Sequence, residues 1–361
     1  MTRDQITRTE TRGTLDGESN REWCHEIIEE ISSTYATTVD FLNEPLATHT
    51  CVAYLLCRIA DTIEDAPKLS AEQKTELLSQ YRTAINSCES HEVYAFTTKA
   101  ISERPSDPLE PVHWRLVART DRVLDAYRAI PDPTRAGIEP TVDELVYGMR
   151  KYCGRDETRS GVRIRTLSDL RRYCYFVAGT VSHFITDVFS TAANTEPSSE
   201  LRACGEKYGL FLQLMNISKN VYHDCRFVRN VFVPESILDR YGVDQSGLLR
   251  ADNRSAVESA IEDVAREARS HVPKARQSLL LLPRTDESVF TAWAFPYLLS
   301  IAILRELETD PGATLEPGGI DIKRAEVMAI IDAVDEADRA SLELFERTIH
   351  QQPLHTKNWR P

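Results

Sequence analysis

Three acidic side chains lie close together at the end of an apolar segment. Asp61, Glu64 and Asp65 follow the apolar run 52–56. If this segment is a helix, their i, i+3 and i+4 spacing places all three carboxylates on one face. Carboxylates this close repel one another, and Mg²⁺ bridging them to phosphate oxygens would relieve the repulsion. The alternative interpretation is a solvated acidic end of a helix.

A second group of polar side chains lies along an otherwise apolar segment. Gln213, Asn216, Asn220 and Asp224 are spaced at i, i+3, i+7 and i+11, which places them along one face of a helix. Buried amides and carboxylates without partners cost free energy. The stripe is therefore expected either to pack against another polar helix or to line a cavity that binds a ligand.

The elements that must position these groups are predicted to be helices. Apolar residues recur at intervals of three and four, and alternating β-type runs are nearly absent. We predict an all-α, single-domain bundle over residues 19–350, with residues 1–18 and the tail 351–361 mobile. The predicted helices span about 22–42, 46–63, 70 onward, 110–129, 141–153, 166–191, 200–224, 254–281, 287–307 and 323–348.

Local signals mark where several of these helices begin and end. Capping-box patterns start helices at Ser70 with Gln73 and at Thr141 with Glu144. Loops are predicted where turn-forming residues gather, at 131–133, 154–161, 194–199, 283–284 and 311–319.

Composition limits the partners and the compartment. The 361 residues are 42% apolar and carry a formal net charge of -13, which argues against broad binding to nucleic acid or to an anionic membrane. Eight cysteines without paired short spacings predict reduced thiols. The polar N-terminus is not a signal peptide, and the longest apolar runs fall short of the roughly 20 residues that span a bilayer. We expect a cytoplasmic protein, or one associated with a membrane surface through its substrate or product.

Together, the motifs resemble the squalene/phytoene synthase family, the head-to-head branch of the trans-isoprenyl diphosphate synthases, and within it the squalene synthases most closely. The resemblance runs from about residue 23 to 334 and keeps the order of the motifs. They are residues 32–35, 54–58, 61–65, 173–179, 209–213, 216–224 and 288–290, with Pro296. It implies a helical bundle of the isoprenoid synthase type, with a central apolar cavity that holds isoprenoid diphosphates.

The resemblance implies two groups of Mg²⁺ ligands on facing helices, with cations beside them that neutralise the diphosphate. The implied metal ligands are Asp61, Glu64, Asp65, Asn216, Asn220 and Asp224, and the cations are Arg58 and Lys219.

Tyr173 matches the family's tyrosine near the first carbocation, and with Asp61 and Asp65 it completes the implied catalytic set. A phenol with an ordinary pKa of ~10 is a poor base, so the departing pyrophosphate or a nearby cation would have to assist it. An ordinary core tyrosine is the alternative.

Other residues are expected to surround the substrate. An apolar wall would exclude the water that otherwise quenches an allylic cation. Its expected members are Val177, Gly179, Val181, Phe211, Leu212, Phe290 and Pro296. Ser32, Tyr35 and Gln213 would add polar contacts.

The implied reaction condenses two farnesyl diphosphates through presqualene diphosphate to squalene, with NADPH as reductant. A phytoene-type or partial reaction, which needs no reductant, and a weak paralogue that only binds isoprenoid diphosphates are the alternatives. The basic residues that could hold the NADPH phosphate are Arg226, Arg229, Lys323 and Arg324. The chain has no GxGxxG fingerprint, so NADPH rests on the resemblance, and the sequence favours surface charge as the interpretation of these four residues.

Three residues depart from the family's pattern. Asn220 stands where aspartate is usual, which should weaken the second metal site. Ser33 occupies the usual arginine position, so a diphosphate contact should be lost. Ser182 replaces a glycine and should narrow or polarise the cavity.

Overall fold

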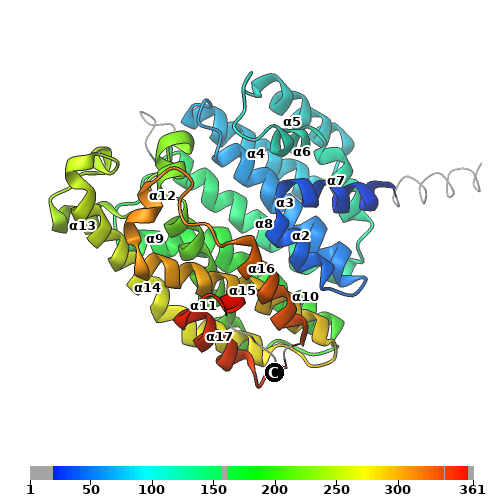
Figure 1. Ribbon diagram of the computed structural model, residues 1–361. Coiled ribbons are helices and arrows are strands. Elements are labelled where there is room, and N and C mark those ends of the chain that lie inside the picture. Colours follow the sequence, from blue (N-terminus) through cyan, green and yellow to red (C-terminus); the bar gives the residue numbers. More distant parts are fainter. Residues whose placement is uncertain (1–18, 156–160, 337, 357–361) are drawn as a thin grey trace, which may run out of the picture.

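The computed structural model describes residues 19–155, 161–336 and 338–356. These residues form a bundle of helices (Figure 1). In the described part of the chain, the only pairing of extended backbone is an isolated bridge between Arg163 and Val231. The predicted all-α fold is therefore confirmed. The expectations for residues 1–18, for most of the loop 154–161 and for residues 357–361 fall outside the described residues.

Central helices carry both polar groups singled out in the sequence. The first acidic group lies at the end of α3 (Leu46–Glu64), and the second group lies along α11 (Ser199–Lys219), α12 (Val221–His223) and the π-helical η2 (Asp224–Val228). Their neighbours are α8 (Asp132–Cys153), α9 (Leu167–Cys174), the π-helical η1 (Tyr175–Gly179), α10 (Thr180–Ala192) and α15 (Glu287–Thr309).

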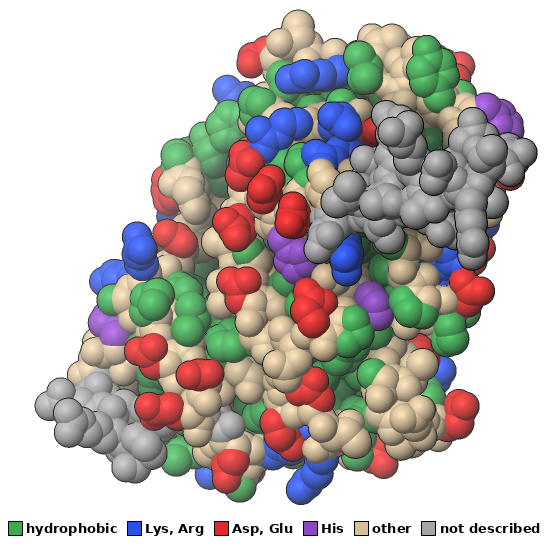
Figure 2. Space-filling model, turned by 90° about the vertical axis from the view of Figure 1, so that its right-hand side faces the viewer, with side chains coloured by type: hydrophobic (Ala, Val, Ile, Leu, Met, Phe, Trp, Pro, Cys, Tyr) green, Lys and Arg blue, Asp and Glu red, His purple; other side chains and the backbone are tan. Residues whose placement is uncertain are grey.

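Other helices cover this centre from several sides. In Figure 1 the α4 to α7 segment lies at one end of the molecule, and α14, α16 and α17 lie at the other. The outer elements are α2 (Ser33–Asp40), α4 (Ala71–Ser87), α5 (Ser90–Glu103), α6 (Pro111–Ala118), α7 (Thr120–Arg128), α13 (Glu235–Leu238), α14 (Arg254–Leu281), α16 (Arg324–Glu336) and α17 (Leu342–Gln351). Figure 2 shows acidic side chains distributed over much of one face, in line with the net charge of -13.

Three predicted helices are divided in the structure: 110–129 into α6 and α7, 166–191 into α9, η1 and α10, and 323–348 into α16 and α17. Two further helix boundaries differ from the sequence prediction for identifiable reasons. The first predicted helix is interrupted at Ser32, whose hydroxyl caps α2 by accepting the Tyr35 N–H at 3.3 Å. The helix predicted from Thr141 begins at Asp132 instead, because proline is tolerated in the first turn of a helix. The capping box of Ser70 is confirmed. The start predicted at Thr141 is wrong, because Thr141 lies inside α8.

α15 is long and apolar enough to cross a membrane by length and composition. Its most apolar 18-residue window is nevertheless 78% buried within the fold. The helix supplies core residues such as Phe290, Phe295 and Leu298 and packs against α11, α14 and α17. Its hydrophobicity is thus accounted for by its place in the core.

Candidate active site

A cavity of about 310 Å³ lies between α3, α8, α10, α11 and α15. One part of its wall is apolar, and the other is polar and charged. The apolar lining includes Ile138, Val142, Leu145, Val177, Val181, Phe184, Ile185, Leu212, Met215, Pro296, Leu299 and Ile303. The charged lining comprises Arg58, Asp61, Glu64, Asp65, Lys219 and Asp224. The cavity therefore has a charged part and an apolar part, and its volume lies in the range typical of ligand-binding sites.

The first acidic group takes its position from the last turns of α3. Burial and the neighbouring carboxylates raise the pKa of Glu64 and Asp65, and burial raises that of Asp61. In the metal-free protein, these groups therefore hold protons to higher pH than ordinary carboxylic acids. A bound cation would favour their ionised forms.

Arg58 stands one turn before these acids with its guanidinium already oriented. It donates two hydrogen bonds to Tyr54 Oη, at 3.1 and 2.9 Å, and lies 3.6 Å from Asp61 Oδ2. The Tyr54 ring stacks on Tyr35 with 4.2 Å between centroids. Tyr54 was not predicted as a site residue, although its position at i-4 from Arg58 was a usable signal.

Glu64 makes a buried contact with the candidate catalytic tyrosine. Tyr173 donates a hydrogen bond to Glu64 Oε2 at 2.8 Å, and its ring packs between Tyr152 and Phe232, each 5.0 Å away between centroids. Glu64 Oε1 is buried with no hydrogen-bond partner among the described residues. An orphaned carboxylate oxygen in such a cluster fits a site for a hard cation.

Asp224 brings the second group to the same cavity. It begins η2 and lies close enough to Asp65 for its negative charge to raise the pKa of that residue. Lys219 lines the cavity beside it, and burial lowers the pKa of this lysine. In the described part of the chain, no three acidic, histidine or cysteine side chains already form a ready-made metal site. The arrangement suits Mg²⁺, which takes one or two carboxylates and leaves positions for water and phosphate.

The polar stripe does not follow one continuous helix, which corrects the predicted helix 200–224. α11 ends at Lys219, and Asn220 is its C-cap. The carbonyl of Lys219 accepts the Ile320 N–H at 3.1 Å, and Thr314 Oγ1 accepts the Val221 N–H at 3.3 Å. Contacts from residues distant in the sequence therefore interrupt the helix. Gln213 and Asn216 line the cavity, whereas Asn220 does not.

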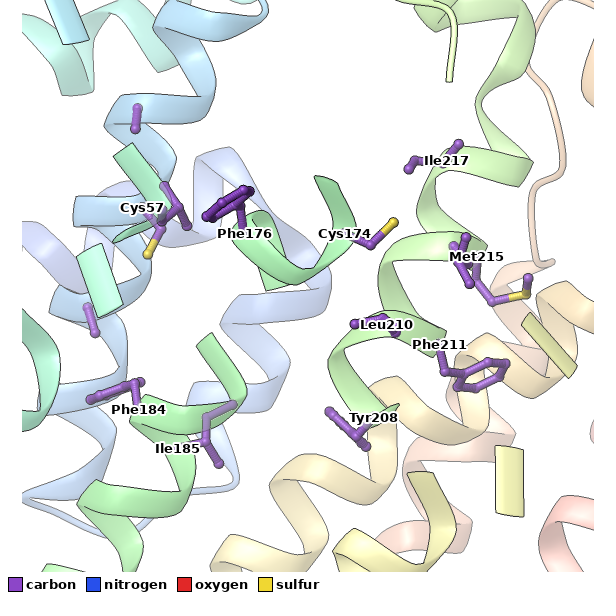
Figure 3. Close-up of a cluster of buried hydrophobic side chains, with 14 of the residues drawn as sticks. Cys57, Cys174, Phe176, Phe184, Ile185, Tyr208, Leu210, Phe211, Met215 and Ile217 are labelled. Carbon is purple, nitrogen blue, oxygen red and sulfur yellow. The ribbon is translucent and has the colours of Figure 1, made fainter. Parts of the chain in front are cut away.

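Three residues expected in the apolar wall lie elsewhere. Phe211 is fully buried and packs on Tyr297 with 5.8 Å between ring centroids, and in Figure 3 its ring points away from Phe184 and Ile185. Phe290 is buried in the core, where Arg339 lies over its ring. Gly179 packs closely against the Tyr175 ring. A Cβ added at position 179 would lie 2.9 Å from a carbon of that ring. The remaining expected wall residues, Val177, Val181, Leu212 and Pro296, do line the cavity.

The other predicted residues divide between the cavity and the surface. Ser32 and Tyr35 line the cavity, but Ser33 is exposed outside it. Ser182 lines the wall, and its hydroxyl donates to the Ala178 carbonyl at 3.2 Å. The four basic residues considered for NADPH, namely Arg226, Arg229, Lys323 and Arg324, are exposed and do not line the cavity.

Asn230 was not predicted as a site residue from the sequence. Its side-chain N–H donates to Asp65 Oδ1 at 3.0 Å, and its backbone N–H donates to the carbonyl of Asp224 at 2.8 Å. The residue lies in an irregular segment after η2, so no periodic pattern could have indicated its position.

An all-α bundle around an apolar cavity with facing acidic groups defines the class of isoprenoid synthase folds. Residues 28–343 match the family model described as squalene/phytoene synthase. The chain belongs to this family, whose members are prenyltransferases.

Similar proteins agree with this assignment. The chain is 25% identical over 289 residues to a squalene synthase of Schizosaccharomyces pombe, covering 80% of this chain and 60% of the relative. It is 24% identical over 290 residues to a squalene synthase of Rattus norvegicus, covering 78% and 62%. The chain thus spans less than two thirds of the length of these curated relatives.

Solved structures share the fold. A TcSQS complex with the ligand BPH1237 superposes with a TM-score of 0.77 at 22% identity, covering 95% of this chain and 93% of that chain. A dehydrosqualene synthase in complex with a ligand gives a TM-score of 0.59 at 16% identity, covering 90% and 98%.

Proposed function

We propose that this chain condenses two prenyl diphosphates head to head, as a farnesyl-diphosphate farnesyltransferase of the squalene synthase type. The observation that carries the proposal is that Asp65 and Asp224, from two separate segments, line one cavity that has both a charged part and an apolar part. An isoprenoid diphosphate has matching parts, because its diphosphate is anionic and its chain is a hydrocarbon. The sequences of named squalene synthases support the same choice.

The residues present fit Mg²⁺ as the resident metal. Asp61, Glu64 and Asp65 would hold it on one side and Asp224 on the other, with substrate phosphates completing the coordination. The unpartnered Glu64 Oε1 supports this assignment. Bound Mg²⁺ would stabilise the negative charge that develops on the departing pyrophosphate.

The side chains of the cavity would orient the diphosphates and protect the cation. Arg58 is held by Tyr54 and presents its charge near Asp61. Together with Lys219, it would bind diphosphate oxygens by charge-assisted hydrogen bonds. When the first carbon–oxygen bond breaks, its electron pair leaves with pyrophosphate and an allylic cation remains. The apolar wall would exclude water, which would otherwise capture that cation.

Tyr173 would then receive the proton whose loss closes the cyclopropane. The double bond of the second prenyl diphosphate attacks the cation, and the proton leaves the new ring carbon. Tyr173 already donates to Glu64, so its oxygen can accept this proton while its own moves to Glu64 Oε2. Burial and the nearby carboxylates raise the pKa of Tyr173 well above its ordinary value, so the phenol reacts in its protonated form.

A phytoene-type or partial reaction is the second candidate. Squalene requires a hydride from NADPH, and the four basic residues considered for its phosphate lie outside the cavity. Ser182, which departs from the family's pattern, lines the cavity wall, whereas the other two departures, Ser33 and Asn220, lie outside it. These observations favour a product formed without reductant, such as a cyclopropyl diphosphate or a dehydro hydrocarbon.

One assay separates the candidates. The purified protein is incubated with farnesyl or geranylgeranyl diphosphate and Mg²⁺, with and without NADPH, and the extracted products are analysed by mass spectrometry. A C30 hydrocarbon that requires NADPH supports the squalene reaction. A product formed equally well without NADPH supports the second candidate. Absence of any condensation product, despite Mg²⁺-dependent diphosphate binding, would contradict both and indicate a protein that only binds.

A further inference from the structure

The two acidic groups of the cavity are connected by a single buried residue. Asn230 is 1% exposed and lies outside the cavity wall. Its side-chain amide donates to Asp65 Oδ1 at 3.0 Å, and its backbone N–H donates to the carbonyl of Asp224 at 2.8 Å. One residue therefore contacts the side chain of one implied metal ligand and the backbone of the other.

Asn230 is itself fixed from a third direction. Its Oδ1 accepts the Val162 N–H at 2.7 Å, and the adjacent Val231 N–H donates to the Val162 carbonyl at 2.9 Å. The side-chain oxygen and nitrogen of Asn230 thus each have a hydrogen-bond partner. These partners determine which end of the amide is the oxygen and which is the nitrogen. An isolated backbone bridge between Arg163 and Val231 joins the same two segments.

The path of the chain between Asp224 and Asn230 depends on this arrangement. The segment forms the π-helical η2 and ends at Arg229, whose positive φ of 68° turns the backbone back toward Asp224. A left-handed conformation is unfavourable for arginine, so the surrounding hydrogen bonds must maintain it. The backbone N–H groups of Arg229 and Asn230 both donate to the carbonyl of Asp224.

The charges at the site explain why such a connection is useful. The negative charges of Asp65 and Asp224 repel each other when both carboxylates are ionised. The Asn230 amide that donates to Asp65 orients this carboxylate. Because the amide is neutral, it does not compete with a bound cation for the negative charge of Asp65. Partners of this kind, which orient ligands without touching the metal, commonly tune metal affinity.

We propose that Asn230 is a positioning residue that sets the separation and orientation of Asp65 and Asp224 for Mg²⁺ and diphosphate. The proposal rests on the proposed function in that it assigns these carboxylates to a diphosphate site. It does not require that the product be squalene.

The test measures binding of inorganic pyrophosphate in the presence of Mg²⁺ by isothermal titration calorimetry, independently of turnover. Asn230→Ala should weaken this binding roughly 10-fold or more, the range typical for partners of metal ligands. It should also raise the Mg²⁺ concentration that gives half-maximal binding. Should the alanine variant fail to fold, Asn230→Ser provides the same test, since it leaves room for a water to satisfy the Val162 N–H.

Gln245 provides a matched control. Its side chain donates to the carbonyls of Ile164 at 2.7 Å and Val233 at 3.3 Å, so it holds the same two segments but does not contact Asp65. Gln245→Ala should leave pyrophosphate binding within about twofold of the unmodified protein. Equal weakening in the Gln245 and Asn230 variants would overturn the proposal, as would unchanged binding in the Asn230 variants.

The binding measurements on the Asn230 variants can be interpreted separately from the question whether the protein catalyses the proposed condensation. If the unmodified protein binds Mg²⁺ and pyrophosphate but forms no condensation product, the condensation is refuted while the role of Asn230 is still decided by the binding data. If condensation occurs and the Asn230 variants bind normally, only the positioning role is refuted.

Discussion

Tyr173 Oη lies 2.8 Å from Glu64 Oε2, so a phenol on α9 is hydrogen-bonded to a carboxylate on α3 at the wall of the cavity. The pair links the implied metal site to the place where the proposed reaction releases a proton. It also gives the buried carboxylate one partner while leaving its other oxygen without one in the described structure.

Removal of the Tyr173 hydroxyl should impair the chemical step without weakening diphosphate binding. Tyr173→Phe is expected to lower kcat by about 100-fold or more, within the usual range for loss of a general acid or base. Binding of Mg²⁺ and pyrophosphate should stay near its original value. Tyr152→Phe is the matched control, because Tyr152 is equally buried but donates to Asp169. A comparable loss of kcat in both variants would show that Tyr173 has only a structural role.

The stability of the metal-free protein should depend on pH in a direction set by the acidic group. The pKa values of Asp61, Glu64 and Asp65 are raised in the folded state, so the folded protein binds more protons than the unfolded chain above the ordinary carboxyl pKa. The contribution of these groups to the free energy of unfolding is therefore greatest at low pH and falls as pH rises through the raised values.

This dependence can be isolated with a variant and a ligand. Asp65→Asn should reduce the loss of thermal stability with rising pH relative to the unmodified protein, because one repelling charge is removed. Mg²⁺ with pyrophosphate should stabilise the unmodified protein more at pH 8 than at pH 5, since cation binding requires ionised carboxylates. If the melting temperatures of the unmodified protein and the Asp65→Asn variant changed equally with pH, the pH dependence would not arise from Asp65.

Gly209 should be required for the packing of α11 against the preceding π-helix and α10. An added Cβ would lie 2.5 Å from the Ala178 carbonyl oxygen, which belongs to the backbone and cannot move aside easily. Gly209→Ala is expected to lower the free energy of unfolding by about 1–3 kcal/mol, as overpacking typically does.

Gly205, one turn earlier on α11, is the control for this prediction. Its added Cβ would come no closer than 3.4 Å, to Thr186 Oγ1. Gly205→Ala should be neutral or stabilising, because alanine favours a helix by about 1 kcal/mol over glycine. Urea denaturation gives the free energy of unfolding of both variants. A greater loss of stability in the Gly205 variant than in the Gly209 variant would contradict the packing described here.

Two adjacent residues of α11 should affect function differently. Leu212 lines the cavity, whereas Phe211 packs on Tyr297 away from it. Leu212→Trp should lower kcat/KM for the prenyl diphosphate by about 10-fold or more, because the larger side chain fills the space of the substrate chain. Phe211→Leu should lower thermal stability and leave the product distribution unchanged. If the Phe211 variant changed the products and the Leu212 variant did not, the cavity wall would be misassigned.

Leu212 and Phe211 also illustrate which features of the site the sequence alone does not predict. The spacing of the apolar residues was enough to predict the helical class, whereas the meeting of residues 61–65 with Asp224 was implied only by the resemblance to a known family. An apolar helix buried on several sides, however, has no solvated face that would distinguish Leu212 from Phe211. Similarly, Asn230 lies in an irregular segment whose path depends on contacts with Val162, Asp65 and Asp224. Long-range contacts of this kind leave no periodic signal.

The most direct test of the central claim is a crystal structure with Mn²⁺ in place of Mg²⁺ and an unreactive thio analogue of farnesyl diphosphate. Anomalous scattering locates the manganese without reference to any expected geometry. We expect manganese between Asp61, Asp65 and Asp224, with the diphosphate near Arg58 and Lys219 and the prenyl chain against Val177 and Leu212. Manganese bound away from these carboxylates, or a prenyl chain bound outside the cavity, would contradict it.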